Sequence, residues 1–217
     1  MEQLNSSQAL SRKEREKFAR QQEILKAARE LFIRKGYHDT TLEEIAHHAE
    51  FGKGTIYNYF SSKEELFNGI INSLVDEMFE LVQSAIAVSG HAREKLTAYA
   101  SAMISHARSN ADLFRLIFQE FHRANSPEFK ENLKHFHERT KKIQELIIHP
   151  IEEEISAGKI RPVDARELIS LFDGMLRSYC LNYLENQFQF QNDDVDTAAA
   201  LIVSVFFDGA AEPNRKG

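Results

Sequence analysis

The chain has 217 residues, of which 42% are hydrophobic and 28% charged, and its net charge is −6. This composition excludes a disordered chain, and the length is sufficient for one large or two small domains with cores. The lone Cys180 excludes an internal disulfide and favours a reducing, cytoplasmic location. The most apolar run, residues 198–207, is far shorter than the roughly 20 residues of a membrane-spanning helix, so we expect no membrane contact.

Residues 1–18 are expected to form a flexible basic arm without a signal-peptide pattern. Residues 1–63 carry 11 Lys and Arg against 9 Asp and Glu, whereas residues 64–217 carry 16 against 24. The charges of the two parts are therefore +2 and −8, and the positive part is the one suited to nucleic acid. The basic side chains of the arm either lie along phosphates or form only a solvated helix start.

Residues 40–63 have the pattern of two short helices, a turn and the start of a third helix. Thr41 and Glu44 have the spacing of a capping box, which predicts that the first short helix begins at Leu42. Apolar residues at helical spacing follow, and the run of residues 51–54 interrupts them.

The second short helix is expected over residues 55–60. Ile56 and Phe60 fall on its buried side, so hydroxyl, amide and aromatic side chains are left on the side that faces solvent. This pattern is typical of a helix-turn-helix that reads DNA. The alternative is a small helical hairpin whose aromatic residues form its core.

Over residues 23–67 the chain resembles the tetracycline-repressor-like (TetR) family of bacterial transcription regulators. The resemblance lies in the order of its parts, which are the helix ILKAARELFIRKGY, the pair Thr40-Thr41, the step Ile45-Ala46, the segment GTIYNYF and the helix start SKEEL. It implies an all-α fold with a three-helix helix-turn-helix domain over residues 19–79. A larger helical domain over residues 80–217 would bind an effector and form the dimer.

The resemblance also implies which residues contact DNA. The recognition helix would contact DNA through Thr55, Tyr57, Asn58 and Tyr59. Lys53 and Gly54 would lead into that helix against the DNA. Thr41 and Lys63 would contact phosphates. Independently of the family, an Asn58 amide suits an adenine edge, and Thr55 suits a thymine methyl.

Two positions depart from the family pattern. Glu50-Phe51 stands where a Gly-Val turn is usual and the nearest glycine is Gly52, which leaves the turn open to a shift of one or two residues. Glu43 stands where a basic residue often helps to hold DNA. We therefore base the DNA-contact prediction on the second short helix more than on the first.

A series of amphipathic helices is expected after this region. Their predicted ranges are residues 63–87, 91–109, 112–122, 127–156, 164–186 and 194–209. Pro150 predicts a kink or break in the fourth of them. The last two are apolar on more than one side. They either form a two-fold four-helix dimer interface, which the resemblance also implies, or belong to the core of the second domain.

Sixteen phenylalanines and no tryptophan are present, and several phenylalanines lie on the later helices. Helices of this kind either enclose an apolar cavity or pack as ordinary core. Beside the family resemblance, the first possibility predicts a hydrophobic or amphipathic small-molecule effector. The candidate pocket residues are Phe114, Phe118, Phe121, Phe136, Phe172 and Tyr179.

We expect no catalytic residue, cofactor or metal site. The pairs His47-His48 and His135/His137 each point to different faces of a helix, and no phosphate-binding loop or activated nucleophile is visible. The sequence therefore predicts a homodimeric transcription regulator that is released from a palindromic double-stranded DNA operator by its effector. The alternative is a structural DNA-binding protein of the same fold that responds to no small molecule.

Overall fold

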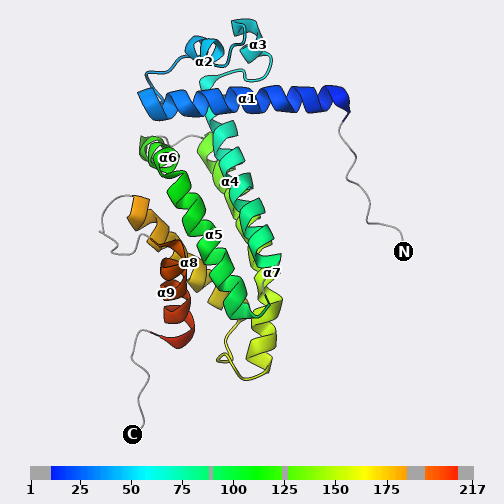
Figure 1. Cartoon of the computed structure of the whole chain (residues 1–217), viewed down its shortest axis with the longest axis vertical. Helices are drawn as coiled ribbons and strands as arrows, with labels where there is room; N and C mark the ends of the chain where they lie inside the picture. The colour runs from blue at the N-terminus through cyan, green and yellow to red at the C-terminus, as the bar shows by residue number, and fades with distance from the viewer. Residues whose placement is uncertain (1–10, 88–89, 124–126, 185–193, 210–217) are drawn as a thin grey trace. The chain divides into compact units, whose positions relative to one another are not determined.

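The computed structural model describes residues 11–87, 90–123, 127–184 and 194–209, and these ranges contain nine helices and no strand (Figure 1). The helices are α1 (Arg12–Lys35), α2 (Leu42–His48), α3 (Lys53–Tyr57), α4 (Lys63–Ala87), α5 (Ala92–Ser109), α6 (Ala111–Arg123), α7 (Pro127–Ser156), α8 (Ala165–Leu184) and α9 (Val195–Asp208). They form two compact units, one ending at Ile71 and the other starting at Asn72, and α4 contributes to both. The predicted all-α fold is confirmed.

The start of α1 differs from the sequence prediction. Ser11 Oγ accepts a hydrogen bond from the backbone N–H of Glu14 (3.3 Å), and the Glu14 carboxylate accepts one from the backbone N–H of Ser11 (2.8 Å). This capping box starts the helix at Arg12. Residues 12–18 are therefore exposed helix, which agrees with the alternative of a solvated helix start and not with a flexible arm, and residues 1–10 lie outside the described ranges.

The first unit is held together by apolar side chains from each of its helices. Phe32 on α1, Ile45 on α2 and Ile56 on α3 have no solvent-accessible surface, and Leu66 at the start of α4 is equally buried. Burying such a side chain stabilises the fold by about 1.5–3 kcal/mol. Helices as short as α2 and α3 are unstable alone in water, so this packing maintains them.

The turn after α2 is closed by a residue with positive φ that is not glycine. Glu50 has φ of 57°, the backbone N–H of Phe51 donates to the carbonyl of Ala46 (2.9 Å), and that of Glu50 donates to the carbonyl of His47 (3.2 Å). These are the two bonds of a Schellman motif, which usually places glycine where Glu50 stands. The left-handed step therefore falls on Glu50, while Gly52 is extended and precedes α3.

In the second unit, α5 packs against α7, α8 and α9 (Figure 1). Three isoleucines one turn apart on α7, Ile143, Ile147 and Ile151, are fully buried. Pro150 was predicted to cause a kink or a break, and a break is excluded because α7 continues through this residue to Ser156. Proline removes one backbone hydrogen bond and strains the preceding turn, and the burial of the isoleucines on either side offsets this cost.

Replacing Glu50 by glycine is expected to raise the free energy of unfolding by about 1 kcal/mol, because the left-handed conformation is unfavourable for a residue with a side chain. Gly36, which ends α1 with φ of 88° and has open space around its Cα, is the matched control. Gly36→Ala should change stability in the opposite direction. Urea denaturation of the three proteins measures both changes, and a destabilised Glu50→Gly variant would contradict the assignment of strain.

Candidate DNA-recognition surface and ligand cavity

The recognition segment, residues 53–59, consists of α3 and the two residues after it. The helix begins and ends earlier than predicted, at Lys53 and Tyr57. Ile56 is fully buried and Phe60 almost so, which confirms the predicted inward side.

The predicted DNA contacts of this segment lie on its other sides. Tyr57 is 46% exposed, Lys53, Gly54 and Asn58 are also exposed, and Thr55 and Tyr59 are half-buried. The fold therefore brings these six residues together on one short stretch and keeps them at least partly accessible. The alternative of a hairpin whose core contains both tyrosines does not fit this arrangement.

Lys53 forms an ion pair with Glu43, the acidic residue that departs from the family pattern. A hydrogen bond from Lys53 is the main cause that lowers the pKa of Glu43, and the same bond raises the pKa of Lys53. The Lys53 ammonium also lies 5.9 Å from the centroid of the Tyr57 ring. A phosphate that approaches Lys53 therefore meets an existing carboxylate partner, which the sequence prediction did not include.

Thr41 caps α2. Its Oγ1 accepts a hydrogen bond from the backbone N–H of Glu44 (3.2 Å), and the Glu44 carboxylate accepts one from the backbone N–H of Thr41 (3.0 Å). The predicted capping box and the helix start at Leu42 are confirmed. Thr41 is exposed, so its hydroxyl remains accessible to solvent while it caps α2.

Lys63 contacts backbone carbonyls in this structure, and its phosphate contact stays a prediction. Its Nζ donates to the backbone carbonyls of Tyr37 (2.8 Å), Thr40 (3.0 Å) and His38 (3.3 Å) and lies 4.5 Å from the Tyr37 ring centroid. An ammonium group has three protons, and these three carbonyls account for all of them. In this structure Lys63 therefore fastens the loop that joins α1 to α2.

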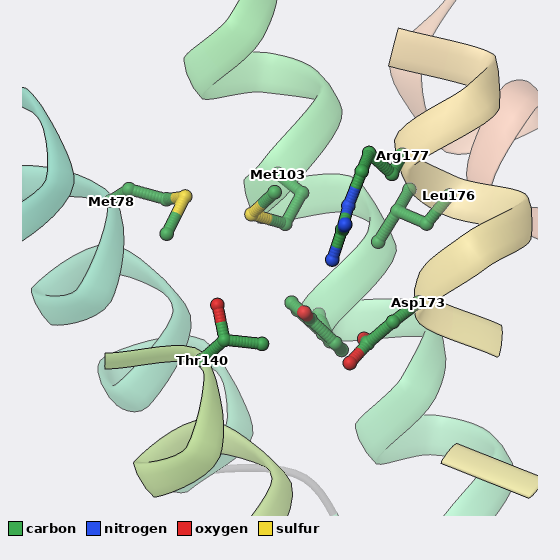
Figure 2. Close-up of a pocket in the computed structure, with 7 residues that line it drawn as sticks. Met78, Met103, Thr140, Asp173, Leu176 and Arg177 are labelled. Carbon is green, nitrogen blue, oxygen red and sulfur yellow. The ribbon is translucent and has the colours of Figure 1, made fainter. Parts of the chain in front are cut away.

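The second unit contains a cavity among four helices, and Figure 2 shows the side chains around it. The centres of water-sized molecules can occupy about 40 Å³ of it. This space holds a few waters or one small chemical group, whereas drug-sized ligands occupy cavities of about 300–1,000 Å³. The lining comes from α4, α5, α7 and α8 and consists of Met78, Tyr99, Met103, Thr140, Asp173, Leu176 and Arg177.

Asp173 is the buried acidic group of this cavity, with only 6% of its surface exposed. Its Oδ2 accepts a hydrogen bond from Gln144 Nε2 (2.6 Å). Burial raises the pKa of the carboxyl, and Gln144, the Tyr99 hydroxyl and Arg177 each oppose that increase. Burial likewise raises the pKa of the Tyr99 hydroxyl well above its ordinary value, and the charge of Asp173 adds to the shift.

Four of the predicted pocket residues, Phe114, Phe118, Phe172 and Tyr179, are described by the structure and do not line this cavity. Phe172 is fully buried and packs edge-on against Phe206, with ring centroids 5.2 Å apart. Phe114 stacks on Phe118 with a centroid separation of 6.3 Å, and Tyr179 packs against the core of the unit. The side chains of Phe121 and Phe136 lie outside the described residues. The sequence signal for the cavity was the single acidic residue in the apolar stretch SLFDGM.

Within the described ranges, no cluster of three or more His, Cys, Asp and Glu side chains has the arrangement of a metal site. No helix in those ranges is both long enough and apolar enough to cross a membrane.

The fold and the accessible recognition segment are those of a helix-turn-helix DNA-binding transcription regulator. Residues 24–70 match the family described as "Bacterial regulatory proteins, tetR family". The chain is 31% identical to the HTH-type transcriptional regulator YhgD of Bacillus subtilis over 179 residues, which are 82% of this chain and 90% of that protein. The chain belongs to the TetR family.

Two solved structures illustrate the shared fold. The FadR regulator of Bacillus subtilis, determined in complex with stearoyl-CoA, superposes with a TM-score of 0.68 at 22% identity, covering 88% of this chain and 99% of that one. A TetR/AcrR-family regulator of Thermobifida fusca has a TM-score of 0.68 at 26% identity, covering 89% and 100%. The identity to FadR is low enough that this likeness concerns the fold alone.

Lys63→Ala is expected to lower the free energy of unfolding by about 2 kcal/mol, because it removes three charge-assisted hydrogen bonds, two of them part-buried. Lys35→Ala is the control, since it removes only a surface ion pair with Glu44 (2.5 Å) and should cost about 0–1 kcal/mol. Urea denaturation compares the two variants. Equal losses would show that the three carbonyl contacts add nothing beyond an ordinary surface pair.

Asp173→Asn is expected to gain stability relative to the wild type as pH rises above about 4. The folded-state pKa of Asp173 lies above the ordinary 3.8, so the folded protein binds this proton more tightly than the unfolded chain does. The resulting stabilisation is complete below the unfolded pKa and is lost as pH rises through the folded pKa, a loss that asparagine does not undergo. Thermal melts from pH 4 to pH 8 measure it, and a pH-independent difference would contradict it.

Proposed function

We propose that this protein is a cytoplasmic repressor that binds a near-palindromic operator as a homodimer and is released from it by a hydrophobic or amphipathic effector. One observation carries the proposal. Helix α4 holds both Lys63, which fastens the loop before α2, and Met78, which lines the cavity. A ligand that moves α4 through Met78 therefore acts on a helix whose first residue contacts the loop before α2.

The direction of the response depends on which conformation each ligand prefers. A ligand shifts the balance between two conformations only as far as its affinities for them differ, and couplings of about 1–3 kcal/mol are typical. The repressor mechanism requires the effector-bound conformation to have lower affinity for the operator. The apolar lining by Met78, Met103 and Leu176, next to the polar Thr140 and Asp173, suits an amphipathic molecule. FadR, whose fold is similar, is known with stearoyl-CoA bound, which supports this class of effector.

The exposed leucines of α8 and α9 support a homodimer through these helices. Leu171 on α8 is 64% exposed and Leu201 on α9 is 55% exposed, although both helices also bury apolar side chains within the chain. Large apolar side chains left exposed on two adjacent helices are typical of a subunit interface. A two-fold dimer would present two recognition segments to successive turns of DNA, about 34–36 Å apart, or to a wider spacing.

The protein is expected to bind the DNA immediately upstream of its own gene selectively and with strong salt dependence. Fluorescence anisotropy of the upstream DNA and of scrambled DNA at several salt concentrations measures this selectivity and salt dependence.

Asn58→Ala should relax base preference by about 1–3 kcal/mol, because it removes the side chain best suited to a base edge. Unchanged base preference would place the recognition surface elsewhere. Operator binding that no small molecule alters would favour a structural DNA-binding protein.

Leu171→Glu is expected to convert the dimer to a monomer, because it places a charge in the centre of the proposed interface. Leu81→Glu is the matched control, since Leu81 is 51% exposed but lies on α4. Sedimentation equilibrium of the two variants and the wild type distinguishes them. Dissociation by Leu81→Glu and not by Leu171→Glu would move the interface to α4.

A further inference from the structure

The Asp173 carboxylate has one oxygen without a hydrogen-bond partner. Oδ2 is engaged by Gln144 and the Tyr99 hydroxyl also interacts with the group, yet among the described residues Oδ1 accepts no hydrogen bond. Leaving such a buried acceptor unsatisfied is unfavourable, and folded proteins rarely retain one without a reason. Because Asp173 lines the cavity, a group bound in the cavity can supply the missing donor.

The surroundings of Asp173 favour its ionised form against the effect of burial. Gln144 and Tyr99 donate to the carboxylate, and Arg177, one helical turn later on α8, adds a positive charge. Gln144, Tyr99 and Arg177 come from three different helices, so the acceptor is held from several sides. An anionic head group placed in the same space would face this carboxylate at close range, which is unfavourable in a site of low polarity.

The rest of the lining suits an apolar ligand body. Figure 2 shows Met78 and Met103 on one side of the space and Asp173 with Thr140 on another. Met78 and Met103 are thioether side chains that rearrange easily, so a cavity that now admits a small group can widen along them. Leu176, which is almost fully buried, completes the apolar side.

We propose that the cavity binds amphipathic molecules through a hydrogen-bond-donating head group, a protonated amine above all, seated on Asp173 Oδ1 with its apolar part against Met78, Met103 and Leu176. This inference rests on the proposed ligand-responsive function and specifies its effector class. It separates this protein from regulators that recognise an acyl chain through an anionic head group. Asp173 is the residue that determines the specificity.

A head-group series tests the assignment on the full-length protein. Decylamine, 1-decanol and decanoate share one chain length and differ in the charge and donor capacity of the head group. Isothermal titration calorimetry below their aggregation concentrations should give an affinity for decylamine at least about tenfold above that for decanoate, with 1-decanol between them. Tighter binding of decanoate or of stearoyl-CoA would overturn the proposal without any variant being needed.

Asp173→Asn should lower the affinity for decylamine by about tenfold or more, since its amide removes the charge of the acceptor. Glu153→Gln is the control, because it removes an exposed carboxylate on α7 whose partner His149 is 3.7 Å away, and it should leave the affinity unchanged. Circular dichroism melts establish that both variants fold. Equal decylamine affinity in the wild type and Asp173→Asn, or equal losses in both variants, would overturn the proposal.

Fluorescence anisotropy of operator DNA, measured with each of the same three molecules, distinguishes the ligand-site assignment from the control of DNA binding by the ligand. Selective decylamine binding that depends on Asp173 but leaves operator affinity unchanged would uphold the ligand site and refute the gating. Operator release by decanoate, without decylamine binding, would uphold the gating and refute the head-group assignment.

Discussion

The contact between the Lys63 ammonium and the carbonyls of residues 37–40 fixes the start of α2, and the position of α3 follows from it. The loop has few other constraints: Gly36 provides a left-handed step, and the buried Thr40 donates its hydroxyl to the Gly36 carbonyl (2.8 Å). Thr41 follows at once as the cap of α2. One cation thus contacts three backbone acceptors of the loop, and it does so from the first residue of the helix that continues into the second unit.

Features that depend on neighbouring residues could be predicted from the sequence. The bounds of α4 and α7, the start of α2 at Leu42 and the inward direction of Ile56 all follow from caps and helical spacing within a few positions. The same logic applies to α1, where Ser11 and Glu14 form a capping box, and the alternation of charges there favoured the helix-start alternative over the flexible arm. At Pro150 the predicted break is absent, because burial of the isoleucines on either side offsets the local helix-breaking signal.

Features that depend on distant residues could not be predicted. The acceptors of Lys63 lie 23 to 26 positions earlier, and nothing in the local sequence distinguishes a lysine that binds carbonyls from one that binds phosphate. The cavity likewise could not be predicted from local sequence, because its lining residues Met78, Met103 and Asp173 come from three helices. Aromatic residues were predicted from the sequence as the pocket lining instead, although a large ring such as Phe172 is well suited to fill a core completely.

The ion pair between Glu43 and Lys53 affects how Lys53 responds to DNA. A phosphate that binds Lys53 displaces the Glu43 carboxylate, so one anionic partner of the lysine replaces another and the number of its ion pairs does not increase. Dissolved salt screens the pair that is broken as well as the pair that is formed. Lys53 therefore adds less to the ionic-strength dependence of DNA association than a solvated lysine would. Its main effect is to favour an anion placed well enough to compete with Glu43, which makes this contact sensitive to the geometry of the DNA backbone.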